Sequence, residues 1–227
     1  MAEVVVALDV PSGDEALRLV GRIPGLRWVK VGSILFTREG PPLVAELRSR
    51  GLEVFLDLKW HDIPHTVAGA VERAAEMDVA MATVHVLGGR AMLEAAAEVA
   101  ARAGGRPGLV GVTVLTSHDT AGYGEAIGAR MASLDTEVVR LARLGTEAGL
   151  RGLVCSPREV AAIRRELGAD PWLVVPGIRG AADDPGDQVR TASAADARRA
   201  GATHLVVGRP ILRADDPGLA FRRLAEG

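Results

Sequence analysis

Short apolar, β-branched runs recur along the chain, and each is bounded by turn residues, which is the pattern of buried β-strands. Their continuous apolar character is typical of parallel strands that are covered on both faces. The predicted strands are Val4–Asp9, Trp28–Gly32, Leu52–Lys59, Val79–Val86, Leu109–Leu115, Gly152–Cys155, Trp172–Pro176 and His204–Gly208.

Between these runs, apolar residues recur with the spacing of amphipathic helices. Ser156-Pro157 reads as an N-cap followed by a first-turn proline, and Gly51, Gly149 and Gly168 stand where helices should end. The predicted helices are Asp14–Ile23, Pro42–Arg50, Thr66–Met77, Arg90–Ala103, Leu134–Ala148, Pro157–Leu167, Ala192–Ala200 and Pro217–Leu224.

Eight β-α units in 227 residues predict an α/β fold of the (β/α)8 TIM-barrel type, with residues 1–227 as a single domain. A doubly wound open sheet is the alternative architecture. No linker, low-complexity tract or second domain is visible in the sequence.

Composition narrows the function classes. A net charge of −2 provides no broad basic field for nucleic acid or an anionic membrane, and the apolar runs are too short to cross a bilayer. The N-terminus has no basic region of the kind that begins a signal peptide. The single cysteine, Cys155, excludes an internal disulfide framework and suits the cytoplasm, where we expect the protein to reside.

Lysine is unusually rare. Lys and Arg together number 27, and only Lys30 and Lys59 are lysines, which leaves 25 arginines. A lysine can shift its pKa and release a proton, whereas an arginine effectively cannot. The two lysines therefore either survive by chance or perform chemistry that arginine cannot perform.

Polar residues gather at the predicted strand ends, where TIM barrels place their active sites. Asp57 and Lys59 are two positions apart on one strand, so their side chains should share a face. Burying alternating charges costs several kcal/mol per ion unless each is paired, which favours a catalytic network over a structural one. The strand-end residues are Asp9, Lys30, Asp57, Lys59, His85, Thr116, Ser117, Pro176, Arg179, Gly208 and Arg209, with Asp62 just beyond.

His61 and His65 flank Asp62 and raise the alternative of a metal site. Pro64 lies between the two histidines and argues against their sharing a helix, and no HExxH motif is present. We therefore expect no metal, and assign the histidines to loop packing or hydrogen bonds around the site.

The segments after the last two strands indicate a phosphate site. Residues 177–189 form a long loop rich in Gly, Pro and Asp, a kind that is often functional. Gly208 allows close backbone approach to an anion, Arg209 offers a forked donor, and Pro210 could open a short helix facing the ligand. The alternative is an ordinary mobile loop with Arg209 on the surface.

With these motifs in place, the chain resembles the orotidine 5'-phosphate decarboxylase family over almost its whole length. The matching stretches are ALDV at 7–10, KVGSILFTREGP at 30–41, FLDLKWHDIPHTV at 55–67, GVTVLTS at 111–117, VVPGIR at 174–179 and VVGRPI at 206–211. Two features depart from the family pattern: HVLGG at 85–89, where a smaller and more polar pair is expected before the glycines, and the absence of an aromatic residue from residues 178–189.

The resemblance implies decarboxylation of orotidine 5'-monophosphate to UMP in de novo pyrimidine biosynthesis, without metal or cofactor. Lys59 would protonate C6 of the pyrimidine, and Asp57 would lie beside the departing carboxylate. Lys30 and Asp62 would complete the charged network, and Asp62, Ile63 and Thr66 would reach into the partner's site in a homodimer. The remaining implied contacts are Asp9 and Lys30 to the ribose, Thr116 and Ser117 near the ribose and base, Pro176 in the substrate site, and Arg179, Gln188, Gly208 and Arg209 to the phosphate.

Three rival functions fit the same barrel. A Mg²⁺-dependent sugar-phosphate decarboxylase or aldol enzyme would share the Asp-x-Lys-x-x-Asp core but should carry another acidic ligand beside it. A Schiff-base aldolase would use a barrel lysine without aspartates on both sides. A non-catalytic nucleotide-binding barrel would keep Arg209 and Gln188 and could lose Lys59.

Overall fold

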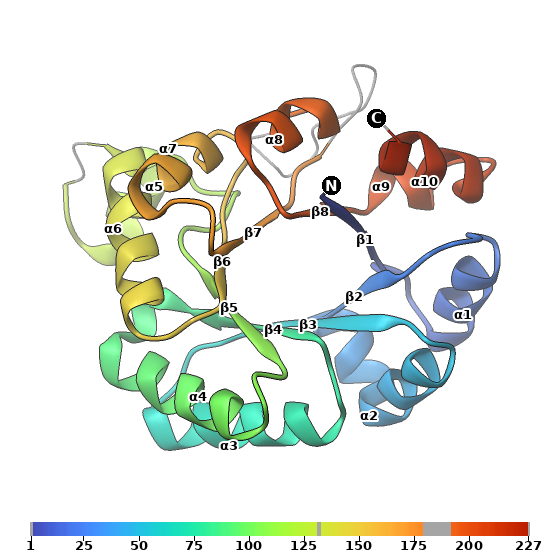
Figure 1. The fold of residues 1–227 in the computed structure, drawn as a ribbon, viewed down its shortest axis with the longest axis horizontal. Helices are drawn as coiled ribbons and strands as arrows, with labels where there is room; N and C mark the ends of the chain where they lie inside the picture. The colour runs from blue at the N-terminus through green and yellow to red at the C-terminus, as the bar shows by residue number, and fades with distance from the viewer. Residues whose placement is uncertain (1, 131–132, 179–191, 227) are drawn as a thin grey trace.

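The computed structural model describes residues 2–130, 133–178 and 192–226. Eight parallel strands form a closed barrel in sequence order, β1-β2-β3-β4-β5-β6-β7-β8, with helices around it (Figure 1). This confirms the (β/α)8 fold and excludes the open sheet. The strands are β1 Glu3–Ala7, β2 Trp28–Gly32, β3 Glu53–Trp60, β4 Met81–His85, β5 Gly108–Val112, β6 Gly152–Val154, β7 Trp172–Val175 and β8 His204–Val207.

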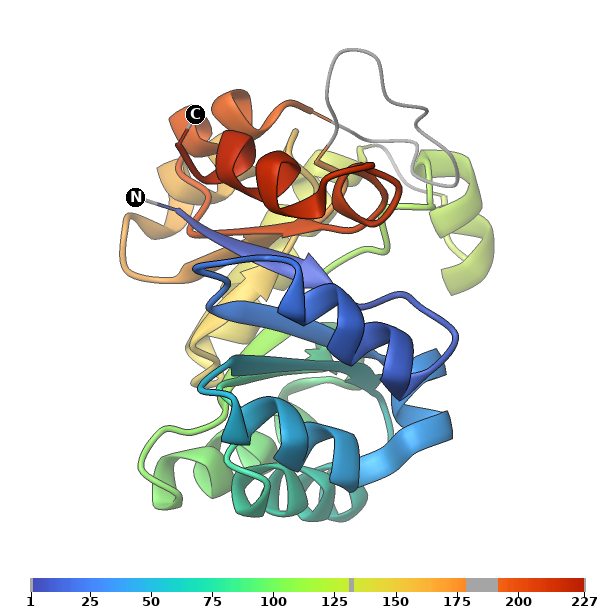
Figure 2. The ribbon, with the colours of Figure 1, turned by 90° about the vertical axis from the view of Figure 1, so that its right-hand side faces the viewer.

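The helices bury their apolar faces against the strands, so the main core lies between the helical ring and the barrel. In the side view the helices run alongside the strands that they cover (Figure 2). They are α1 Gly13–Gly21, α2 Ser33–Ser49, α3 Pro64–Glu76, α4 Arg90–Arg102, α5 Thr120–Ile127, α6 Leu134–Glu147, α7 Val160–Leu167, α8 Ala194–Ala200, α9 Arg209–Leu212 and α10 Pro217–Glu226, with a 3₁₀ turn, η1, at Val86–Gly88. None of the helices in these described ranges is long and apolar enough to cross a membrane.

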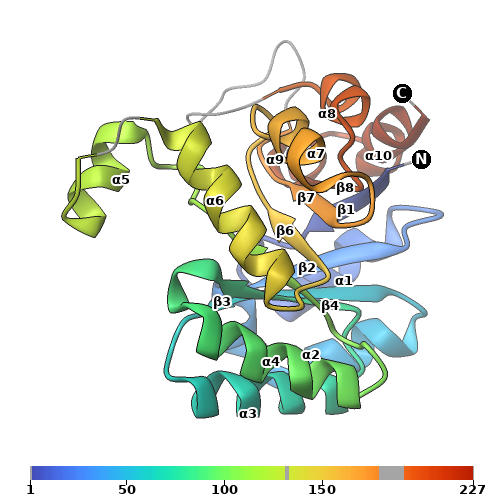
Figure 3. The same ribbon diagram turned by 60° about the vertical axis from the view of Figure 1, so that its left-hand side comes forward.

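Helix ends account for most differences from the sequence prediction. α2 begins at Ser33 rather than Pro42, because a bend at Gly40, with φ of 64°, joins two helical pieces. α7 begins three residues later than predicted: residues 157–159 form a turn, in which the Glu159 N–H donates to the Ser156 carbonyl and the Ser156 N–H donates to the Glu159 carboxylate. The sequence pattern missed α5, which stands away from the barrel strands beside α6 (Figure 3).

A second, smaller cluster fills the barrel interior below the C-terminal ends of the strands. At its lower end, Trp28 of this cluster meets Trp172 and His204, each the first residue of its strand, and we call these three rings the floor. The His204 ring centroid lies 5.1 Å from that of Trp28, edge to face, and 5.2 Å from that of Trp172. Gly108 makes room for the Trp172 ring, because a Cβ there would lie 2.6 Å from it. The floor closes the N-terminal end of the barrel, so the site must open at the other end.

Candidate active site

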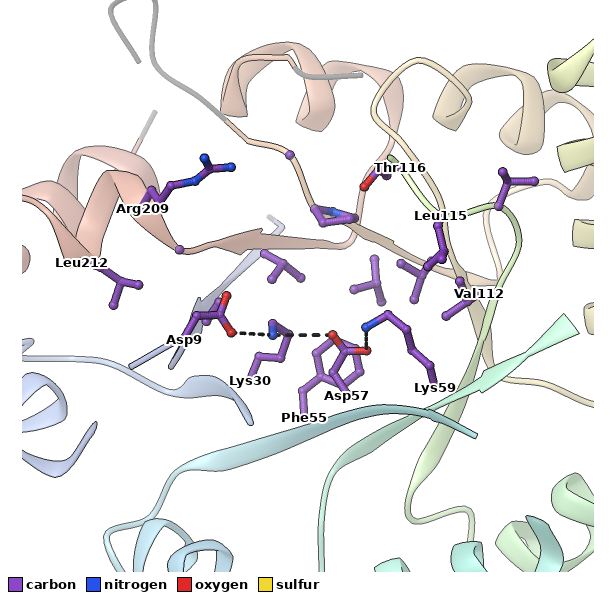
Figure 4. A pocket seen from close by; sticks show the side chains of 18 residues that line it. Asp9, Lys30, Phe55, Asp57, Lys59, Val112, Leu115, Thr116, Arg209 and Leu212 are labelled. Carbon is purple, nitrogen blue, oxygen red and sulfur yellow. Dashed lines mark hydrogen bonds and ion pairs between the residues drawn. The ribbon is translucent and has the colours of Figure 1, made fainter. Parts of the chain in front are cut away.

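A cavity of about 490 Å³ lies at the C-terminal end of the barrel. Charged side chains line one part of it, and valines from β5, β6, β7 and β8 line another (Figure 4). Such a cavity can hold a small molecule with a charged end and an apolar face. The lining residues are Ala7, Asp9, Lys30, Phe55, Asp57, Lys59, Val112, Val114, Leu115, Thr116, Val154, Val174, Pro176, Gly177, Val206, Gly208, Arg209 and Leu212.

Four charged side chains form a row of alternating sign across the cavity, which we call the charged row: Asp9, Lys30, Asp57 and Lys59 (Figure 4). Lys30 Nζ donates to Asp9 Oδ1 at 3.0 Å and lies 3.5 Å from Asp57 Oδ2. Lys59 Nζ donates to Asp57 Oδ1 at 2.9 Å. The row joins Lys30, Asp57 and Lys59, as the sequence predicted, but within one chain its fourth member is Asp9 and not the predicted Asp62.

Asp57 is the most tightly held carboxylate of the row. Its side chain is only 13% exposed. Burial would raise the pKa of its carboxyl, but the charges of Lys30 and Lys59 and hydrogen bonds from Lys59 and Thr83 outweigh that effect and hold the pKa below its ordinary value. The site therefore keeps a fixed negative charge between two ammonium groups.

Lys59 reaches the cavity from an irregular stretch of β3 rather than from the regular strand that the sequence predicted. Its φ is 54°, in the left-handed region that residues other than glycine rarely adopt. The pairing of β3 with β4 shifts between Leu56 and Trp60. Strain of this kind is characteristic of functional sites, where surrounding contacts hold it in place.

Two glycines let the charged row pack closely. A Cβ at Gly32 would lie 3.1 Å from Lys30 Nζ and 3.6 Å from Asp9 Oδ1. A Cβ at Gly208 would lie 3.6 Å from Asp9 Oδ2, at the point where β8 passes into α9. A Cβ at position 32 would therefore push the Lys30 ammonium aside by a few tenths of an ångström.

The predicted phosphate residues Gly208 and Arg209 line the cavity, and Pro210 lies in the first turn of α9 as expected. Thr116 and Pro176 also line it, whereas Ser117 is exposed and does not. Arg179 and Gln188 lie outside the described residues.

Asp62, Ile63 and Thr66 do not line the cavity of their own chain; all three are exposed at the start of α3. Asp62 Oδ1 accepts a hydrogen bond from the Ile63 N–H at 2.6 Å. The Ile63 residue is 65% exposed, and Ile34, at the start of α2 in the preceding β-α unit, is 80% exposed. Large apolar residues exposed beside a cavity mouth are typical of an interaction surface.

The histidines are separated as Pro64 predicted. His65 lies in α3, whereas His61 precedes it and packs against His85, with ring centroids 5.5 Å apart. Burial, helped by the nearby His61 and Lys59, lowers the pKa of His85. Within the described ranges no three His, Cys, Asp or Glu side chains are grouped as a metal site would require.

Sequence reasoning missed Thr83, which contacts Asp57 from β4. The signal was a single hydroxyl residue inside the apolar run MATVHV, two positions before His85. It also missed the valines of the cavity wall, because their spacing is that of any barrel core.

Comparison with known proteins gives one consistent result. Residues 2–224 match the model of the orotidine 5'-phosphate decarboxylase / HUMPS family. The chain is 54% identical over 223 residues to the orotidine 5'-phosphate decarboxylase of Halorhodospira halophila, covering 97% of this chain and 93% of the relative. It is 50% identical over 224 residues to that of Alkalilimnicola ehrlichii, covering 98% and 94%. The crystal structure of orotidine 5'-phosphate decarboxylase from Lactobacillus acidophilus superposes with a TM-score of 0.89 at 31% identity, over 100% of this chain and 98% of that one.

Proposed function

The chain belongs to the orotidine 5'-phosphate decarboxylase / HUMPS family, and from this premise we propose that it converts orotidine 5'-monophosphate to UMP and carbon dioxide. It is a carboxy-lyase, like the relatives that it matches. The observation that carries the proposal is the charged row, which sets an ammonium group on each side of the buried Asp57 carboxylate.

Loss of carbon dioxide from C6 of the pyrimidine leaves an electron pair on that carbon. A site without an electron sink must stabilise this charge with fixed positive groups and then supply a proton. Lys59 can do both, because an ammonium both attracts the developing charge and donates to it. Its 2.9 Å contact with Asp57 holds the ammonium in place before the reaction begins.

Asp57 is proposed to face the departing carboxylate. Asp9 and Lys30 are proposed to contact the ribose, and Lys30 also holds Asp57 in place. Thr116 and Pro176 are proposed to border the ribose and base, with Ser117 nearby. The phosphate is proposed to bind Gly208 and Arg209 together with Arg179 and Gln188. Binding energy from the phosphate, far from C6, can then assist the chemistry.

We further propose a cytoplasmic homodimer in which Asp62, Ile63 and Thr66 enter the partner's site. Their exposure at the cavity mouth supports this arrangement, as does the exposed Ile34. Asp62 would then extend the charged row of the neighbouring subunit by one carboxylate.

The family name covers more than one activity, so the Mg²⁺-dependent rival needs its own test. A divalent cation binds hard oxygen ligands such as paired carboxylates. Here the Lys30 ammonium occupies the space between the Asp9 and Asp57 carboxylates, at 3.0 and 3.5 Å. This favours chemistry based on fixed ammonium groups over chemistry based on a metal.

The deciding experiment follows the absorbance of orotidine 5'-monophosphate after addition of purified protein, with and without EDTA. Turnover to UMP that resists EDTA is the expected result. Turnover to UMP that EDTA abolishes would refute the metal-free mechanism. No turnover of orotidine 5'-monophosphate, with Mg²⁺-dependent turnover of a sugar phosphate, would indicate the rival. A folded protein that binds UMP without turnover would indicate a nucleotide-binding barrel.

A further inference from the structure

The irregular stretch of β3 faces a single residue of β4. Leu56 pairs with Ala82 and Trp60 pairs with Val84, so residues 57–59 stand opposite Thr83 alone. We call these three residues the β3 bulge. A bulge of this kind re-aims side chains and leaves backbone groups without their ladder partners. Asp57 and Lys59 are its first and last residues.

Thr83 is fully buried, and its side-chain hydroxyl supplies a hydrogen-bond partner for the backbone of the β3 bulge. The Lys59 N–H donates to Thr83 Oγ1 at 2.8 Å, and Thr83 Oγ1 lies 3.1 Å from Asp57 Oδ1. A backbone N–H can only donate, so the hydroxyl accepts there. Its one proton is then directed to the carboxylate. The direction of both hydrogen bonds is therefore fixed.

We propose that Thr83 is a positioning residue, whose hydroxyl locks the β3 bulge and the Asp57 carboxylate into the arrangement that presents Lys59 to the substrate. The inference rests on the proposed function for its kinetic consequence, but its structural consequence can be measured separately. Thr83 does not line the cavity, so it acts through Asp57 and Lys59 rather than on the substrate.

The geometry explains why a hydroxyl is needed at this position. Asp57 Oδ1 accepts from both Thr83 and Lys59 Nζ, which leaves Oδ2 turned toward Lys30 at 3.5 Å. Valine has the shape of threonine but offers neither an acceptor for the Lys59 N–H nor a donor for Asp57. Serine keeps both functions with one methyl group fewer.

The kinetic test compares Thr83→Val with Thr83→Ser. Removing a hydrogen bond to a charged group should lower kcat by roughly ten- to a hundred-fold in the valine variant, with a smaller change in KM. Because the hydroxyl helps to keep Asp57 ionised, the acid limb of the kcat/KM profile should also move to higher pH. The serine variant should stay near the wild type in both respects.

Thr113→Val is the matched control, because Thr113 is also a fully buried barrel threonine but donates to the Val154 carbonyl at 3.1 Å. It should leave kcat and the pH profile unchanged. Equal losses in Thr83→Val and Thr113→Val, or in Thr83→Val and Thr83→Ser, would overturn the proposal by showing a general effect on the core.

Hydrogen exchange of the Lys59 amide, followed by NMR, gives a readout that does not depend on turnover. The amide should be protected in the wild type and in Thr83→Ser, and should exchange at least ten-fold faster in Thr83→Val. Unchanged protection in Thr83→Val would refute the proposal. If the wild type fails to decarboxylate orotidine 5'-monophosphate, the proposed function is wrong. The exchange rate of the Lys59 amide still tests the positioning role of Thr83.

Discussion

Replacing His204 with phenylalanine should remove one source of the protein's loss of stability between pH 8 and pH 5. Burial in the floor, with a smaller contribution from the charge of Arg27, lowers the pKa of His204 from 6.5 to about 4. The folded protein thus keeps this imidazole neutral at a pH where the unfolded chain protonates it. The depressed pKa makes folding less favourable as the pH falls from 6.5 toward 4.

The size of the effect follows from the two pKa values. Between pH 8 and pH 5 the linkage amounts to about 2 kcal/mol of unfolding free energy, from a pKa of 6.5 in the unfolded chain and about 4 in the fold. Phenylalanine cannot take up a proton but keeps a ring between Trp28 and Trp172. Between pH 8 and pH 5 the His204→Phe variant should therefore lose about 2 kcal/mol less unfolding free energy than the wild type, whatever its stability at pH 8.

Urea unfolding at both pH values, at one subunit concentration, measures this difference. Trp28 and Trp172 adjoin the replaced ring, so two of the three tryptophans in the chain report on the floor. His118→Gln, in the segment between β5 and α5, is the control and should keep the acid sensitivity of the wild type. If His204→Phe loses as much stability as the wild type between pH 8 and pH 5, the floor does not hold a neutral imidazole and the reasoning is wrong.

Three further predictions concern the charged row. Lys59→Arg should lower turnover by roughly 10²-fold or more, because arginine keeps its proton. The affinity for UMP, measured by calorimetry, should stay near that of the wild type. Normal turnover in this variant would show that Lys59 is not the proton donor. Gly32→Ala should lower kcat/KM by less than about a hundred-fold, because its Cβ would lie 3.1 Å from Lys30 Nζ and push the ammonium by a few tenths of an ångström. Gly21→Ala, with open space around it, should have no effect. Mixing an inactive Asp62→Ala variant with inactive Lys59→Ala should restore part of the activity if subunits share sites; no recovery after proven subunit exchange would count against the shared site.

Much of the fold could be read from the sequence because its signals are local. Continuous valine-rich runs marked all eight strands, and the glycines at 51, 149 and 168 ended helices as predicted, with positive φ at each. Helix starts were less predictable. Ser156-Pro157 has the composition of an N-cap, but the Ser156 hydroxyl caps no N–H, residues 157–159 form a turn, and α7 begins at Val160.

The candidate site was predictable where a charged residue stood at a strand end, as with Asp9, Lys30 and Asp57. The irregular geometry of Lys59 was not, since the two-residue spacing from Asp57 suggests a regular strand. The bulge arises from the register between β3 and β4, which depends on contacts between residues more than twenty positions apart. The same long-range pairing gives Thr83 its partners; the lone hydroxyl in MATVHV marks the residue, but no local pattern reveals which groups it contacts.

The floor also has a consequence for how molecules enter and leave the barrel. Across the described residues, side chains fill the interior beneath the charged row, so molecules enter and leave by the same mouth. A nucleotide reaching from Arg209 to Lys59 would lie across that passage. Carbon dioxide released near Asp57 would then have to diffuse past the bound nucleotide, or leave through the mouth after the nucleotide has dissociated. The route by which both products leave would thus be restricted by Trp28, Trp172 and His204, none of which lines the cavity.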